Sequence, residues 1–197
     1  MMFSTHILAG ASLGLLSFLI SPQLMPVAVL AGMIGGFLPD IDMLLEHRKT
    51  THRPFQYLVL TTVFLAAVLL QGGAYLVFAT FLLGSMMLHS FMEIFSNGKT
   101  MRPKKETDDR AVFNHFTGNW IKPRRTVIDA SFRDLMCTVF FSIPVLAYGI
   151  HFYLVSAVLV WGIIYFLTAD WMKEKMAGYE RFSQFFQHMI GFGPEVN

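Results

Sequence analysis

Residues 55–93 read FQYLVLTTVFLAAVLLQGGAYLVFATFLLGSMMLHSFME, and this stretch decides the fold class. It contains no Lys, Arg or Asp, and its one Glu is its last residue, Glu93. Two apolar runs, 55–71 and 74–93, flank the tripeptide Gln71-Gly72-Gly73, and each approaches the length that a helix needs to cross a bilayer. The stretch therefore predicts two membrane-spanning helices joined by a short turn.

The whole 197-residue chain has a membrane composition, with 54% hydrophobic residues, 14% charged residues and a mean hydropathy of +0.52. Four further stretches carry almost no charge, and several are short enough to predict tilted or irregular helices. These stretches are roughly 5–20, 24–38, 135–149 and 152–169. We expect an all-α, polytopic helical membrane protein with about six apolar helices, forming a single integral-membrane domain over residues 1–197.

Two segments outside the apolar stretches have their own character. In the loop 95–134, nine basic and five acidic residues lie between Asn97 and Asp134, with Phe113, Phe116 and Trp120 among them. That composition suits a segment lying on anionic headgroups, and it equally suits a plain cytoplasmic connector. Residues 172–191 carry apolar side chains at helical spacing, which predicts an amphipathic helix in the membrane interface or packed on the bundle.

The charges predict an orientation in the membrane. If the six stretches alternate in direction, the connections at 21–23, 71–73 and around 149–151 contain no charged residue. All 15 Lys and Arg residues then fall on the opposite side, which the positive-inside rule assigns to the cytoplasm. We expect a multi-pass protein of the cell (inner) membrane with both ends of the chain in the cytoplasm.

Four clusters of histidine and carboxylate side chains stand at the ends of apolar stretches, and the same threading puts them all at the cytoplasmic rim. Such groups are unfavourable beside hydrocarbon unless they are paired, functional or bound to a cation. A shared metal ion is the simplest single cause. The candidate ligands are His6, Asp40, Asp42, His47, His52, His89 and Glu93.

The local patterns fit that interpretation. His89 and Glu93 are four residues apart and therefore share a helix face. Pro39 disfavours helix continuation, so Asp40 and Asp42 are expected on the turn that ends the second stretch. Imidazole mixed with carboxylate suits zinc above all, with manganese or iron as alternatives, and one or two ions. Asp42 could bridge two ions, orient a histidine or act as the catalytic general base.

Three basic residues, Arg48, Lys49 and Arg53, lie between and beside His47 and His52. Cations beside a metal site are expected if the substrate is anionic, so these three are candidate substrate-binding residues and a phosphate ester is the candidate substrate. They could instead be ordinary positive-inside residues of a cytoplasmic loop. The formal net charge of only +2 predicts no specific nucleic-acid partner.

The clusters, in this order, resemble the YdjM-type membrane-bound metal-dependent hydrolases, a family that includes a LexA-binding, inner-membrane-associated hydrolase. The resemblance covers about the first 98 residues. It rests on His6 with Gly10, Leu38-Pro39-Asp40-Ile41-Asp42, His47-Arg48-x-x-Thr51-His52 and His89-Ser90-x-x-Glu93. It implies a multi-span helical protein whose divalent-metal ligands are the seven candidates above. Lys49, Arg53 and Glu93 depart from that family's frequent Gly, Ser and Asp.

The expected function is a membrane-bound, metal-dependent hydrolase that works like a phosphoesterase. Its substrate would be a phosphate ester or another anionic ester at the cytoplasmic membrane face, such as a phospholipid-like molecule. The alternative is a non-enzymatic membrane protein, either a metal or ion carrier or a membrane-anchored interaction protein. A carrier needs its site within reach of both faces, and the uncharged opposite side of this chain argues against one.

Overall fold

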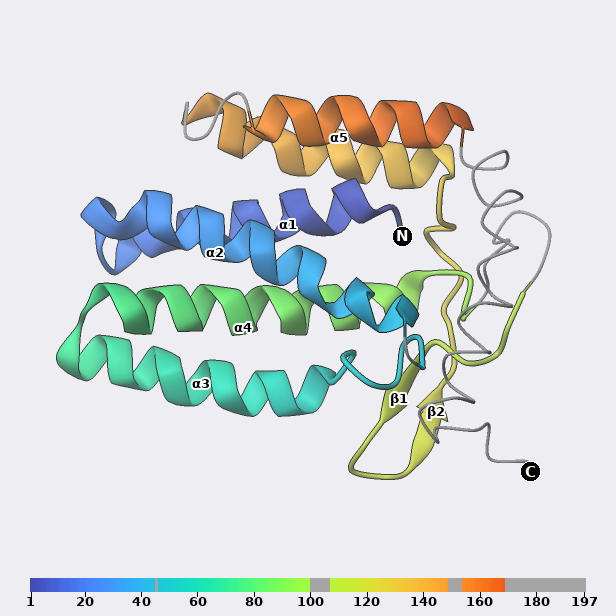
Figure 1. The fold of residues 1–197 in the computed structure, drawn as a ribbon, viewed down its shortest axis with the longest axis horizontal. Helices are drawn as coiled ribbons and strands as arrows, with labels where there is room; N and C mark the ends of the chain where they lie inside the picture. Colours follow the sequence, from blue (N-terminus) through green and yellow to red (C-terminus); the bar gives the residue numbers. More distant parts are fainter. Residues whose placement is uncertain (45, 100–106, 149–153, 169–197) are drawn as a thin grey trace.

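The protein is a bundle of roughly parallel and antiparallel helices with one small β-hairpin at an end (Figure 1). The structure, a computed structural model, describes residues 1–44, 46–99, 107–148 and 154–168. The α-helices are α1 (Phe3–Leu15), α2 (Met25–Phe37), α3 (Pro54–Gln71), α4 (Ala74–Met92) and α5 (Phe132–Ala147), and a further apolar helix covers Leu154–Thr168. Short 3-10 segments are η1 (Leu16–Leu19), η2 (Pro22–Leu24), η3 (Leu38–Leu44) and η4 (Glu93–Phe95).

Helices α3 and α4 form the predicted helical hairpin. Pro54 occupies the first turn of α3, where its missing N–H is harmless. Gly72 and Gly73 have φ angles of 68° and 104°, a left-handed backbone region that glycine adopts without strain. This glycine pair ends α3 and lets the chain reverse directly into α4.

Helix α1 is the centre of the bundle and packs against α2, α4 and α5. Gly10 of α1 faces Gly32 of α2 so closely that a Cβ on either residue would overlap the carbonyl of the other. One turn further on, Gly36 lies against the carbonyl of His6. Small residues thus let the two backbones touch, as is common between membrane helices, and they draw His6 towards the end of α2.

Three helical stretches are long and apolar enough to cross a membrane, not the six that the sequence led us to expect. They are Pro22–Asp42, Pro54–Gln71 and Ala74–Phe95. The 16 residues of α5 would extend about 24 Å, short of a hydrocarbon core of about 30 Å. The segments Phe3–Leu19 and Leu154–Thr168 are also shorter than a full span. Every one of the six apolar stretches contains a helix, so the difference from the expectation lies in the length of the helices.

The two ends of the bundle differ in character. Among the described residues, one end carries the short α1–α2 and α3–α4 connections, whereas the other carries η3, the loop before α3, and the hairpin (Figure 1). Strands β1 (Val112–Asn114) and β2 (Asn119–Ile121) pair antiparallel within the predicted loop 95–134. The amide of Phe113 in β1 donates to the carbonyl of Arg48, 3.1 Å away, and so attaches the hairpin to the loop before α3. The predicted amphipathic helix 172–191 lies outside the described residues.

Candidate metal centre

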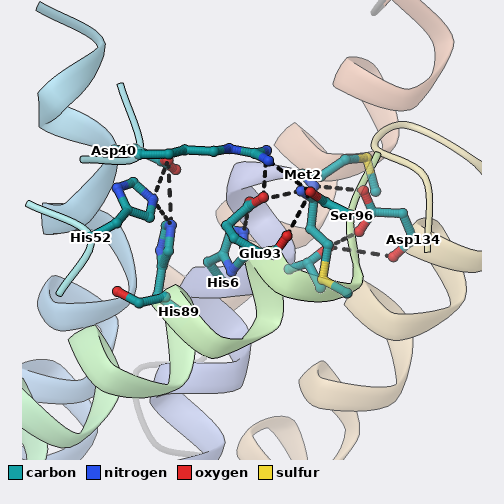
Figure 2. A network of polar contacts seen from close by, with 12 residues as sticks. Met2, His6, Asp40, His52, His89, Glu93, Ser96 and Asp134 are labelled. Atoms are coloured by element: carbon teal, nitrogen blue, oxygen red, sulfur yellow. Dashed lines mark hydrogen bonds and ion pairs between the residues drawn. The ribbon is translucent and has the colours of Figure 1, made fainter. Parts of the chain in front are cut away.

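The histidine and carboxylate clusters meet at the hairpin-bearing end of the bundle. His6 comes from α1, Asp40 from η3, His52 from the loop before α3, and His89 from α4. Glu93 opens η4 directly after α4. Two overlapping groups could each hold a metal ion, His6 with His89 and Glu93, and Asp40 with His52 and His89. In each group the candidate ligand atoms lie within 4.8 Å of one another (Figure 2).

The ring of His89 is oriented by the backbone of α2. Its Nδ1 lies 2.7 Å from the carbonyl oxygen of Gly36. A carbonyl oxygen can only accept a hydrogen bond, so Nδ1 carries the proton. The other nitrogen of the neutral ring, Nε2, therefore presents a lone pair.

The ring of His52 is oriented in the same sense by a carboxylate. Its Nδ1 lies 2.9 Å from Oδ2 of Asp42, which leaves Nε2 of the neutral ring as an acceptor. Burial lowers the pKa of His52, although the hydrogen bond to Asp42 opposes that effect. The ring is thus neutral at neutral pH, and its lone pair is free to bind a cation.

The Nε2 atoms of the two rings face each other. Nε2 of His52 and Nε2 of His89 are 3.1 Å apart, and Oδ1 of Asp40 lies 3.4 Å from His89 Nε2 and 3.9 Å from His52 Nε2. Two unprotonated nitrogens and a carboxylate oxygen repel one another unless a proton or a cation lies between them. Donor atoms bound at about 2.0–2.1 Å to a tetrahedral ion lie roughly 3.3 Å apart, close to these separations. The residues therefore fit a divalent metal.

The second group lies directly beside the first. The ring of His6 stacks on the ring of His89 with centroids 3.7 Å apart, and its Nε2 lies 2.8 Å from Oε1 of Glu93. Nδ1 of His6 is buried without a hydrogen-bond partner among the described residues. Glu93 also forms an ion pair with Arg48, and its Oε1 lies 2.8 Å from the amino group of Met1. Glu93 is thus held by cations and by His6 together.

Asp42 and His47, also predicted as ligands, lie outside both groups. Asp42 uses one carboxylate oxygen for Nδ1 of His47 and the other for Nδ1 of His52, each at 2.9 Å. The backbone N–H of Thr51 donates to the same Oδ2 from 3.3 Å. Of the three roles open to Asp42 from the sequence, this geometry corresponds to the orienting one. Such carboxylate partners fix the direction of a metal-binding imidazole.

The three predicted substrate-binding cations have different environments. Arg48 is buried, donates from Nη1 to Oγ of Ser96 at 2.8 Å and pairs with Glu93. Nζ of Lys49 lies 3.0 Å from Oε2 of Glu46, with which it forms an ion pair. Nε of Arg53 donates to the carbonyl of Thr50 at 2.8 Å on the surface. Of these three cations, Arg48 is the one that contacts a candidate ligand.

Some residues that build this end of the bundle were not singled out by the sequence. Asp134, at the start of α5, accepts hydrogen bonds from the N–H of Met2 and the hydroxyl of Thr5 and so fixes the beginning of α1 (Figure 2). Its own N–H is capped by Ser131. The pattern Ser131-x-x-Asp134 before an apolar run is a helix-start signal that could have identified it. The role of Gly36 as the acceptor for His89 has no comparable signal, because a backbone carbonyl is common to every residue.

The centre is shielded from water on most sides. His6, His52, His89 and Glu93 are each at most 2% exposed. The side chain of Asp40 is 17% exposed, which gives this carboxylate contact with solvent. Asp40 is thus more exposed than the other four residues of the two groups.

Comparisons with known proteins identify no relative of this chain. No protein-family model matches it, and no significant match was found among curated proteins or among solved structures.

Proposed function

We propose that this protein is a membrane-bound, metal-dependent hydrolase that acts on a phosphate ester or another anionic ester at the cytoplasmic face of the membrane. The observation that carries the proposal is the convergence of Nε2 of His52, Nε2 of His89 and Oδ1 of Asp40 at one point between α4, η3 and the loop before α3. The resemblance of the four clusters to the YdjM-type hydrolases supports the same reaction class.

The ligand chemistry favours zinc, with manganese or iron as alternatives, because two imidazoles and a carboxylate form a mixed nitrogen and oxygen set. His89 belongs to both candidate groups, yet its single Nε2 lone pair can bind one ion. His6 and Glu93 therefore either complete the coordination of that ion or contribute to a second one. One or two ions are compatible with this arrangement.

A bound divalent cation would supply Lewis acidity, lowering the pKa of water and offsetting charge on the reacting ester. Asp42 would keep the Nε2 of His52 directed at the centre. Arg48 would contribute positive charge behind Glu93, and Asp40, being partly exposed, would lie on the side from which substrate enters. We assign Asp42 an orienting role in preference to that of general base, because both of its oxygens accept hydrogen bonds from imidazoles.

We further propose that all six apolar stretches lie within or against the bilayer of the inner membrane, with the metal centre on the cytoplasmic side. The three longer stretches would span, and the shorter α1, α5 and Leu154–Thr168 helices would pack on them with tilt or local thinning of the bilayer. The absence of charged residues from the 21–23 and 71–73 connections supports this orientation.

Metal content tests the centre directly. We would purify the protein in mild detergent and measure bound zinc, manganese and iron by elemental analysis for wild type, His52→Ala and Asp40→Asn. We expect bound metal in wild type and a large loss in both variants. His115→Ala, a histidine of the hairpin outside the centre, is the control and should retain the metal. Full retention in both ligand variants would remove the proposal.

Hydrolysis distinguishes the enzyme from its alternatives. We expect a chromogenic phosphodiester to be cleaved by the metal-loaded protein, and the activity to disappear in His52→Ala but not in His115→Ala. Bound metal without hydrolysis of phosphoesters or carboxylate esters would favour a carrier or a structural metal. A protein that neither binds metal nor hydrolyses these esters would favour the membrane-anchored interaction protein.

A further inference from the structure

The β-hairpin presents an exposed aromatic side chain beside a candidate membrane span. Phe116, in the turn between β1 and β2, is 67% exposed. Its ring lies 6.3 Å from the ring of Phe55, in the first turn of α3, and Phe55 in turn packs on Phe91 of α4. The turn is well defined, because Asn114 accepts hydrogen bonds from the amides of Phe116 and Gly118. The tip of the hairpin therefore adjoins the end of the α3–α4 pair.

The surface below Phe116 is apolar and open. Leu58 and Val59, three and four residues after Phe55, lie on the same side of α3 and are 44% and 56% exposed. Only 11% of the α3 candidate span is buried inside the protein. An apolar surface thus continues from the hairpin tip on to a helix face that would contact lipid.

Cations gather over the aromatic rings on the body of the hairpin. Phe113 and Trp120 are paired across the two strands with ring centroids 5.4 Å apart. Nζ of Lys49 lies 5.1 Å from the centroid of Phe113, and Nζ of Lys99 lies 5.4 Å from the centroid of Trp120. The guanidinium of Arg110 is also over Trp120, at 5.8 Å. Rings that sit under cations are typical of the headgroup level of a bilayer, where Trp and basic side chains are both favoured.

The hairpin and its flanks have a positive charge balance. Residues 107–127 contain four basic and two acidic side chains, and Lys49 and Lys99 add positive charge from either side. Lys and Arg near an anionic membrane surface are attracted to it electrostatically. Charge and aromatic content therefore match the same partner.

We propose that the β1–β2 hairpin is a membrane-contacting element that binds anionic phospholipid headgroups, with Phe116 entering the boundary between headgroups and acyl chains beside α3. Anionic lipid is the expected partner for two reasons. Phe116 adjoins the exposed apolar face of α3, and the positive charge of the hairpin complements anionic headgroups. This inference concerns a surface outside the metal centre and stands whether or not the protein is a hydrolase.

Spin labels on the full-length protein test this surface, because Cys137 is the only cysteine of the chain. In a Cys137→Ser background, Phe116→Cys carries the label of interest. Asp109→Cys carries the control label, since the side chain of Asp109 is 77% exposed and acidic. The proteins are placed in nanodiscs of phosphatidylcholine, with or without phosphatidylglycerol, and label accessibility to oxygen and to a water-soluble nickel chelate is measured.

We expect the label at position 116 to show a severalfold higher ratio of oxygen to nickel accessibility than the label at 109 when phosphatidylglycerol is present. The ratio should fall when salt screens the headgroups or when phosphatidylglycerol is omitted. Equal, water-like accessibility at both positions in both lipids would overturn the proposal. So would a lipid-like signal at 116 that is the same in both lipids, because headgroup charge would then play no part.

Two further measurements identify the source of the effect. Lys99→Gln should reduce the dependence on phosphatidylglycerol, whereas Arg133→Gln, which removes one positive charge at the start of α5, should leave it unchanged. Inorganic phosphate added to phosphatidylcholine nanodiscs should not reproduce the effect, and if it does, the hairpin binds a free anion and the proposal fails. Circular dichroism and thermal unfolding of each variant establish that it is folded.

Discussion

His52 and His89 each have one nitrogen directed at the protein and one directed at the candidate centre. The inward-facing hydrogen bonds, to Asp42 and to the Gly36 carbonyl, determine which nitrogen carries the proton. The suitability of these residues as metal ligands is therefore set by groups that would not themselves touch the metal. Of the two, Asp42 can be tested by substitution of its side chain, whereas Gly36 acts through its backbone carbonyl, which a substitution retains.

Replacement of Asp42 tests this orienting role. Asp42→Asn leaves one oxygen where two imidazoles each need an acceptor, so one ring must reorient. We expect metal affinity to fall by about 10- to 100-fold, the range typical of partners that support ligand histidines. Competition with a fluorescent chelator measures the change. Asp109→Asn, which removes a surface carboxylate, is the control, and an unchanged affinity in Asp42→Asn would contradict the assignment.

Acidification should release the metal. Protonation of an imidazole competes with metal binding, so affinity falls once the pH drops below the pKa of the ligand. Because burial lowers the pKa of His52, this ring remains neutral to a lower pH than an ordinary histidine. We therefore expect the metal to stay bound at mildly acidic pH and to be lost on stronger acidification. Equilibrium dialysis across pH measures this profile, and release already at neutral pH would contradict it.

At the scale of helices, glycine contacts determine how closely α1, α2 and α4 approach. Gly10 and Gly32 bring α1 against α2, and Gly35 lies against the carbonyl of Leu82 in α4. Dispersion contacts between closely packed backbones stabilise membrane helices in the absence of a hydrophobic drive between them. The same contacts set the distance between the helices that carry His6 and His89.

A pair of matched substitutions tests this packing. Gly32→Ala would force a methyl group into the carbonyl of Gly10, and we expect it to destabilise the protein by about 1–3 kcal/mol or more. Gly84→Ala is the control, because its methyl group would meet Leu13 and Thr61 at 3.4 Å, an ordinary contact. Thermal unfolding in detergent should show a clear loss for Gly32→Ala and little change for Gly84→Ala. Equal midpoints would contradict the packing argument.

The elements were predictable to different degrees. The α3–α4 hairpin followed from its apolar runs and from Gly72 and Gly73, because local residue chemistry decides both the helices and the turn. The span count did not follow, since apolar character does not fix where α1 changes to the 3-10 segment η1. The hairpin at 112–121 was missed, although Thr117-Gly118-Asn119 between short β-prone runs is a turn signal.

The sequence predicted which residues gather at the candidate centre better than it predicted how their side chains are arranged there. Sequence order and charge indicated one end of the bundle for all seven residues. The division into two overlapping groups, and the position of Asp42 and His47 behind His52, depend on ring directions that arise only when α2, α4 and η3 pack together. The pairing of Arg48 with Glu93 is a long-range contact of the same kind.

At the scale of the whole molecule, all described Lys and Arg residues lie at or near the end that carries the hairpin (Figure 1). This asymmetry predicts one orientation in the membrane. The connection at Gln71 should face the outside, and Lys122, after β2, should face the cytoplasm.

Cysteine labelling tests the orientation. In the Cys137→Ser background, we expect Gln71→Cys to react with a membrane-impermeant maleimide in cells whose outer membrane is permeabilised and whose inner membrane is intact. Lys122→Cys should react only after the inner membrane is opened. The inverted pattern, or reaction at both positions from one side, would contradict the orientation.

Arg48 belongs to two parts of the molecule at once. Its carbonyl accepts the amide of Phe113 in the hairpin, while its guanidinium holds Glu93 and Ser96. It adopts a φ of 63°, which is unusual for a residue with a side chain and is maintained by these contacts at both ends. Arg48 thus connects the hairpin to Glu93, so a movement of the hairpin on the proposed lipid surface would reach this candidate metal ligand through a single amino acid.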